Sequence, residues 1–152
     1  TVSGAHSKIG KTTLIERMLG SLKGWGALKV TVLHSGLACP AGRSCNGCED
    51  IDTEFSIIDD EAVLTAPGKD TYRFKKAGAK KILWLKSKKE GLERGIEKAL
   101  LEFKKVKGII IEGTSVLAYL KPDLALFIKG SDSNFKPSAE KNYNKVDLVI
   151  TL

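Results

Sequence analysis

The chain has 152 residues and a mass of 16.5 kDa, the size of one ordinary domain, which argues against a two-domain enzyme. With 42% hydrophobic and 28% charged residues, and no apolar run near the ~20 residues of a membrane span, the composition excludes disorder and a transmembrane helix. The 25 basic and 18 acidic side chains give a net charge of +7, which favours an anionic partner. The lysines are dispersed and there are only four arginines, so we do not expect that partner to be nucleic acid.

Apolar periodicity predicts short strands that alternate with amphipathic helices. Strands are expected at Thr1 to Ser3, Lys29 to His34, Phe55 to Ile58, Lys81 to Lys86, Gly108 to Glu112, Leu124 to Ile128 and Asp147 to Leu152. Helices are expected at Lys11 to Lys23, Thr71 to Ala77 and Glu90 to Lys105, and a turn-rich loop at about 35–52. Because the strand segments are continuous apolar runs, the sheet should carry helices on both faces. The sequence therefore predicts one α/β domain over 1–152, a three-layer P-loop NTPase-like fold with a mostly parallel sheet.

The segment after the first strand fits the pattern of a phosphate-binding loop. Ala5 takes the first small-residue position and Gly4 stands one place too early, but a strand precedes the loop and a helix follows it. Backbone N–H groups that end on a helix N-terminus concentrate positive potential where a phosphate binds. We therefore expect nucleotide contacts from Ala5, His6, Ser7, Lys8, Ile9, Gly10, Lys11, Thr12 and Thr13.

Three residues of this loop have specific expected roles. Gly10 allows close approach of the backbone, Lys11 reaches the β- and γ-phosphates as a catalytic residue, and the Thr12 hydroxyl joins the Mg²⁺ shell. Lys8 is expected to be a solvated lysine without a role in a partner subunit's site, because His6 holds the position from which such a lysine acts.

A carboxylate beside the metal is expected from Glu112, which ends a buried strand at the sheet edge where ligands bind. Asp59 and Asp60 are rival candidates. Alternatively, Glu112 caps the segment Gly113-Thr114-Ser115 that follows it.

Three separated segments resemble the family of the molybdopterin-guanine dinucleotide biosynthesis protein B (MobB). They are GAHSKIGKTTL (Gly4 to Leu14), PGKDTYRFKKAGA (Pro67 to Ala79) and IIIEG (Ile109 to Gly113), and together they span most of the chain. The middle segment is the most specific of the three.

The resemblance implies a small homodimeric P-loop protein that binds GTP and Mg²⁺. Such a protein assists a partner molybdopterin guanylyltransferase, with weak or partner-dependent GTP hydrolysis. It further implies that Asp70 and Arg73 lie at or near the nucleotide site together with Glu112. From the residues alone, Asp70 could instead be the N-cap of a short helix and Arg73 a member of a surface ion pair. The histidine-rich stretch common in the family is replaced here by His34 alone.

All three cysteines fall in the loop after that histidine. Cys39, Cys45 and Cys48 have the spacing C-x5-C-x2-C, and His34, a carboxylate such as Asp50 or a partner subunit could complete a four-ligand site. The expectation is a structural Zn²⁺ or an iron–sulfur cluster, with a Cys45–Cys48 redox pair or unliganded thiols as alternatives.

The quartet Asn144-Lys145-Val146-Asp147 spells the guanine signature N-K-x-D, but it precedes a strand where that signature follows one, so we interpret it as a coincidence. Three hypotheses remain: a GTP-binding accessory protein of molybdenum cofactor maturation, a small-molecule kinase on the same loop, and a metal-binding scaffold with a non-hydrolysing loop. No charged-then-apolar leader begins at Thr1, so a cytoplasmic location without membrane contact is expected.

Overall fold

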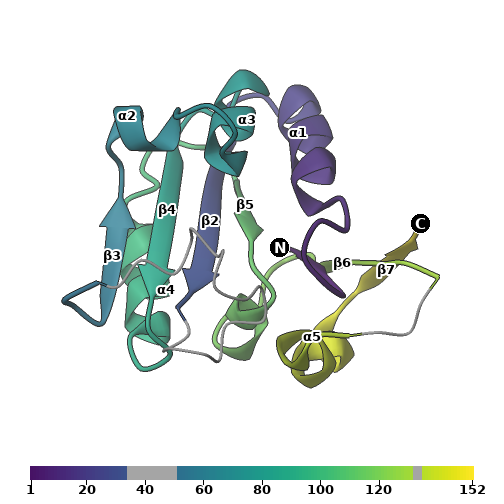
Figure 1. The fold of residues 1–152 in the computed structure, drawn as a ribbon. Coiled ribbons are helices and arrows are strands. Elements are labelled where there is room, and N and C mark those ends of the chain that lie inside the picture. The colour runs from purple at the N-terminus through teal and green to yellow at the C-terminus, as the bar shows by residue number, and fades with distance from the viewer. Residues whose placement is uncertain (34–50, 132–134) are drawn as a thin grey trace.

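The computed structural model describes residues 1–33, 51–131 and 135–152, and every structural statement below concerns these residues. They form one seven-stranded sheet flanked by helices (Figure 1). No helix in these ranges is both long enough and apolar enough to cross a bilayer.

Strands and helices alternate along most of the chain. The strands are β1 (Val2–Gly4), β2 (Gly26–Val32), β3 (Phe55–Ile58), β4 (Ile82–Ser87), β5 (Ile109–Glu112), β6 (Leu126–Lys129) and β7 (Leu148–Thr151). The helices are α1 (Lys11–Ser21), α2 (Glu61–Leu64), α3 (Asp70–Lys76), α4 (Leu92–Leu101) and α5 (Pro137–Asn142), with the 3₁₀ turns η3 (Ser115–Ala118) and η4 (Tyr143–Lys145).

The order of strands in the sheet is β3-β4-β2-β5-β1-β6-β7, and only the β3–β4 pair is antiparallel. From β1 the chain passes through α1 to β2 on one side, whereas from β5 it passes to β6 on the other side of β1. Ligands of open α/β sheets bind at the carboxyl edge where the strand order reverses in this way. The fold therefore places the position where such ligands bind directly after β1.

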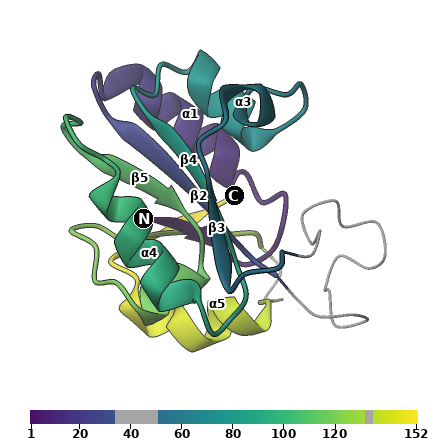
Figure 2. The same cartoon turned by 90° about the vertical axis from the view of Figure 1, so that its left-hand side faces the viewer.

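Two helical layers bury the two faces of the sheet. Figure 2 shows α1 and α3 on one face and α4 and α5 on the other. Ile15 and Leu19 of α1 and Phe74 of α3 are fully buried in the first layer, and Leu92 and Ile96 of α4 are buried in the second. Each such side chain contributes roughly 1.5–3 kcal/mol by leaving water, so both layers are held mainly by apolar burial.

Three aromatic rings pack the two ends of α5 against β6. The ring centroids of Phe127 and Tyr143 lie 5.0 Å apart in an edge-to-face arrangement, and Phe135 lies 5.4 Å from Phe127. Aromatic pairs of this geometry add roughly 0.5–1.5 kcal/mol beyond their burial. Buried Ala5, the first residue of the loop after β1, belongs to the same cluster, so this packing also positions the loop.

The predicted three-layer α/β class with a mostly parallel sheet is confirmed. The predicted burial of every strand on both faces is wrong for β7, because Leu148 is 53% exposed at the sheet edge. Two short helices, α2 and α5, were not predicted.

Candidate nucleotide-binding site

The loop between β1 and α1 begins at the carboxyl end of β1, where the strand order reverses. Its first residue, Ala5, is buried and held from two sides. The Ala5 N–H donates to the carbonyl of Ile128 on β6, and the Ala5 carbonyl accepts from the N–H of Lys136, both at 2.9 Å. The loop is therefore anchored to β6 and to the residue that precedes α5.

Two glycines and one lysine give the loop its course. A Cβ at Gly4 would lie 2.6 Å from the Ile9 Cγ2, so only glycine fits there without displacement. Gly10 has φ 95°, a backbone conformation that glycine adopts without strain. Lys8 has φ 63°, and a non-glycine residue in this left-handed region costs roughly 1–2 kcal/mol.

The helix that follows the loop begins without a side-chain cap. Gly10 is the N-cap residue of α1, no side chain accepts from the first turn, and that turn has no acidic residue. The first N–H groups of a helix need acceptors, and together with the helix dipole they attract anions. The amino end of α1 thus presents the donors of a phosphate site.

Lys11 lies in the first turn of α1, and its side chain folds back along the loop. The Lys11 Nζ donates to the His6 carbonyl at 3.1 Å. Burial lowers the pKa of Lys11, whereas the charges of Glu112 and Asp70 raise it. A half-buried ammonium beside N–H groups without a side-chain acceptor is well placed to meet a phosphate oxygen in place of the loop carbonyl.

Thr12 and Asp70 connect the loop to α3. The Thr12 hydroxyl donates to the Asp70 Oδ1 at 3.1 Å, and the Asp70 Oδ2 forms an ion pair with Lys29 of β2. Burial acts to raise the pKa of Asp70, but the hydrogen bond and charge of Lys29 and the hydrogen bond of Thr12 hold it below its ordinary value. Asp70 is the first residue of α3 and Lys69 its N-cap, so the alternative that Asp70 is the N-cap is wrong.

Arg73 joins α3 to α1 beside this contact. Its guanidinium donates to both carboxylate oxygens of Glu16, with 2.8 Å between Nε and Oε1, and to the Thr13 hydroxyl at 3.2 Å. The structure therefore places Arg73 near the loop, as a brace between two helices. The pair with Glu16 agrees with the alternative that Arg73 belongs to a surface ion pair.

Glu112 ends β5 at the same edge. It is 8% exposed, and its Oε2 has no hydrogen-bond partner. Burial is the main cause that raises the pKa of Glu112, and the charges of Lys29 and Lys11 oppose that rise. The turn η3 that follows has Thr114 as its N-cap residue and no side-chain cap, which gives no support to a capping role for Glu112.

These groups fit a magnesium ion only together with a ligand. Across the described parts of the chain, no three His, Cys, Asp or Glu side chains gather closely enough to hold an ion alone. Mg²⁺ at a phosphate loop takes few protein ligands and completes its shell with phosphate oxygens and water. The Thr12 hydroxyl and the unpartnered Glu112 oxygen fit that arrangement, with Asp70 orienting the hydroxyl.

Lys136 is a charged residue at this site that the sequence did not suggest. Burial and the nearby charge of Lys11 lower its pKa to about 8, and the charge of Glu112 opposes the shift. The pair Lys136-Pro137 opens α5, and proline in the first helical turn is a recognisable start signal. That signal could have located the helix, but not its proximity to the loop.

Other predicted candidates lie elsewhere. Asp60 caps α2 by accepting from the N–H of Ala62 at 2.8 Å. Asp59 and Asp60 follow β3, which is antiparallel to β4, so they lie at the edge of the sheet opposite to Glu112. Neither is therefore an alternative to Glu112 as the carboxylate beside the metal. His34, Cys39, Cys45 and Cys48 lie outside the described residues, and Asp50 does too.

The quartet Asn144-Lys145-Val146-Asp147 lies at the amino ends of β6 and β7, far along the strands from the loop. The Asp147 carboxylate accepts from the Ala125 N–H at 2.6 Å, and Lys145 donates to the Leu117 carbonyl at 2.8 Å. Both side chains therefore serve the local fold, which supports the interpretation of this match as a coincidence.

Comparisons with protein-family models, with curated proteins and with solved structures find no match to this chain. The fold defines the class, a three-layer α/β protein in which a loop joins the first strand to a helix that has no side-chain cap. What the chain does has to be argued from that site.

Proposed function

We propose that this chain binds a purine nucleoside triphosphate with Mg²⁺ on the loop Ala5–Thr13. The uncapped amino end of α1, directly behind the loop, is the observation that carries the proposal. In this function Lys11 binds the terminal phosphates, and Thr12 and Glu112 share the metal with phosphate oxygens and water. The metal would offset the negative charge that develops between the phosphates.

The choice of GTP and of molybdenum cofactor maturation rests on the resemblance to the MobB family. It gains support from where the three resembling segments lie. Thr12 of the first segment contacts Asp70 of the second at 3.1 Å, and Glu112 of the third acts on the pKa of Lys11. Segments that are far apart in the sequence thus lie near one another, and this supports the proposal.

In this proposal the chain is an accessory protein with weak or partner-dependent hydrolysis. It works as a homodimer with a guanylyltransferase-type partner that transfers GMP to molybdopterin. The proposal agrees with the residues around the loop, because Arg73 is paired with Glu16 and no other arginine contacts the loop in the described residues. An intrinsic fast hydrolase commonly adds such a cation to stabilise the transition state.

The proposal is tested by titrating fluorescent guanine and adenine nucleotides with Mg²⁺ into wild type, Lys11→Ala and Lys23→Ala. Lys23 is exposed beyond the end of α1, so its variant is a charge-matched control. We expect guanine preference, about a hundredfold weaker binding for Lys11→Ala and no change for Lys23→Ala. Binding that is equal for both bases and insensitive to Lys11→Ala would refute the proposal, and rapid phosphate transfer to a small alcohol would favour a kinase.

A further inference from the structure

Two lysines approach the loop from opposite faces of the sheet. Lys11 belongs to α1 and Lys136 is the N-cap residue of α5, and Figure 2 shows these two helices on different faces. Successive residues of β6 face the two layers in turn, because Ile128 packs in the core with α1 and Phe127 packs with Ala139 of α5. The loop therefore lies where side chains from both layers can meet a ligand.

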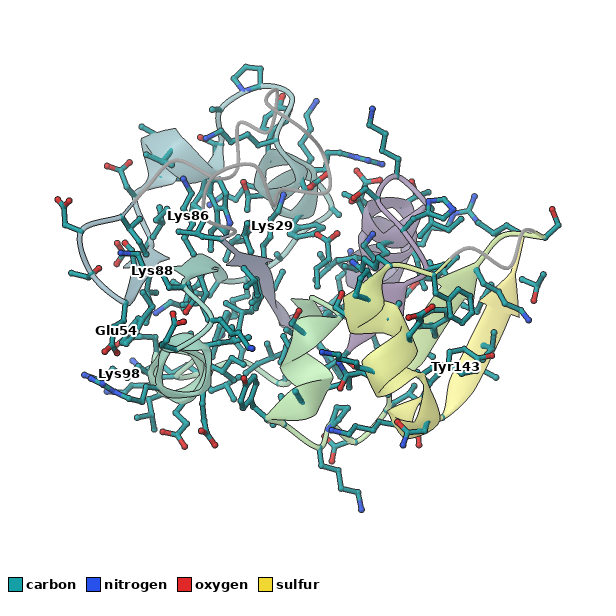
Figure 3. The ribbon with its side chains drawn as sticks, turned by 60° about the horizontal axis from the view of Figure 1, so that its bottom comes forward. Lys29, Glu54, Lys86, Lys88, Lys98 and Tyr143 are labelled. Carbon is teal, nitrogen blue, oxygen red and sulfur yellow. The ribbon has the colours of Figure 1, made fainter. Side chains whose placement is uncertain are left out.

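The backbone of Lys136 is fixed beside the loop. Its N–H donates to the carbonyl of Ala5 at 2.9 Å, and Ala5 is fully buried. The neighbouring Phe135 packs against Tyr143, which is labelled in Figure 3, with 5.2 Å between the ring centroids. Ala139 of α5 is fully buried in the same cluster. The position of Lys136 is thus set by packing on both sides of it in the chain.

The side chain of Lys136 is half-buried but has no partner in the described parts of the chain. Its ammonium forms no ion pair there, with Glu112 or any other carboxylate, and no side-chain hydrogen bond. Burial, and then the charge of Lys11, lower its pKa to about 8, whereas the charge of Glu112 raises it. The charge of Lys136 in turn opposes the rise in the pKa of Glu112. The ammonium therefore lies within electrostatic range of both groups.

Positive charge is in excess around the loop of the nucleotide-free chain. The charge of Glu112 acts on both Lys11 and Lys136. The charge of Asp70 acts on Lys11 as well, but Asp70 is paired with Lys29. The uncapped amino end of α1 adds further positive potential. A nucleoside triphosphate with one Mg²⁺ still carries negative charge, which two ammonium groups would offset.

We propose that Lys136 is a second phosphate-binding lysine, which donates to the phosphates of the bound nucleotide from the α5 side while Lys11 donates from the α1 side. This role rests on the proposed nucleotide function and adds to it a residue outside the loop pattern. Lysine suits the role because its ammonium carries three donors on a flexible stem. The two lysines hold the phosphate chain between them, one from each helical layer.

The role is tested by titrating a fluorescent, non-hydrolysable GTP analogue with Mg²⁺ into wild type, Lys136→Met, Lys136→Arg and Lys141→Met. Lys136→Met keeps the apolar stem and removes the charge, and Lys136→Arg keeps the charge. Lys141→Met is the matched control, because Lys141 is exposed on the same helix. At pH 7 we expect Lys136→Met to bind about tenfold more weakly than wild type. Lys136→Arg should recover most of that loss, and Lys141→Met should bind as wild type does.

Urea unfolding of the nucleotide-free proteins separates a phosphate contact from a role in positioning the loop. Lys136→Met should lose affinity without losing stability, because the charge of Lys136 is disfavoured in the free chain. Loss of both affinity and stability would overturn the inference, as would equal weakening by Lys136→Arg or by Lys141→Met. Binding to wild type that Lys136→Met leaves unchanged refutes this role alone. Failure of wild type to bind refutes the proposed function, and this role with it.

Discussion

Lys136 carries a positive charge that its surroundings disfavour. Burial, and then the charge of Lys11, lower the pKa of this ammonium from 10.5 to about 8. At a pH where Lys136 is charged in both the folded and the unfolded chain, this difference in pKa destabilises the folded chain by roughly 3 kcal/mol. Replacing Lys136 by Met keeps the apolar stem and removes the charge. Lys136→Met should therefore raise the free energy of unfolding by up to about 3 kcal/mol at pH 7.

The same pKa shift fixes the sign of the pH dependence. Between about pH 8 and 10.5 the folded protein releases the Lys136 proton while the unfolded chain keeps it, so the wild type gains stability as the pH rises. Lys136→Met lacks this gain. The stability difference between the two proteins should therefore shrink as the pH rises from 7 through this window.

Urea unfolding of the nucleotide-free proteins at pH 7 and at pH 9.5 measures both effects. Lys141→Met is the control, because Lys141 is an exposed lysine on the same helix, α5. It should change stability little at either pH. A destabilised Lys136→Met, or a stability gain that is the same at both pH values, would show that the Lys136 ammonium is well solvated or well paired and would refute the reasoning.

Two further substitutions test the loop and its neighbour. Asp70→Asn leaves Lys29 without its carboxylate partner and weakens the hydrogen bond from Thr12. The free energy of unfolding, measured by urea titration at pH 7, should therefore fall by about 1–2 kcal/mol. An unchanged urea midpoint would mean that this ion pair is fully screened. Lys8→Gly relieves the strain of the left-handed backbone at φ 63°, but glycine loses more chain entropy on folding. The net increase in the free energy of unfolding should be about 0.5–1 kcal/mol by thermal unfolding. A lower melting temperature would contradict this prediction.

The sequence predicted the elements whose signals are local. α1 and α4 carry apolar residues at helical spacing, and both were placed within a few residues of their observed bounds. α2 has four residues and α5 has six, too few for a periodic pattern to stand out. The antiparallel pairing of β3 was equally hidden, because a short apolar strand has the same composition in either direction.

The loop was predictable for the same reason, since its residues are consecutive. The groups around it come from distant parts of the chain. Lys29 and Asp70, which form an ion pair, are separated by 41 positions, and Lys136 reaches the loop through a hydrogen bond to Ala5 and the aromatic packing of α5. Such contacts are made by the sheet topology, and a single sequence carries no local mark of them.

The missing side-chain cap of α1 links the stability of the fold to the concentration of its ligand. No side chain accepts from the first N–H groups of this helix, and an anion bound there would supply the acceptor. Ligand binding to the folded chain alone then adds to its stability, by about 2.7 kcal/mol at a hundredfold excess over the dissociation constant. The fraction of chains that are folded at any moment would thus follow the concentration of the ligand they serve, and chains made in its absence would be the first to unfold.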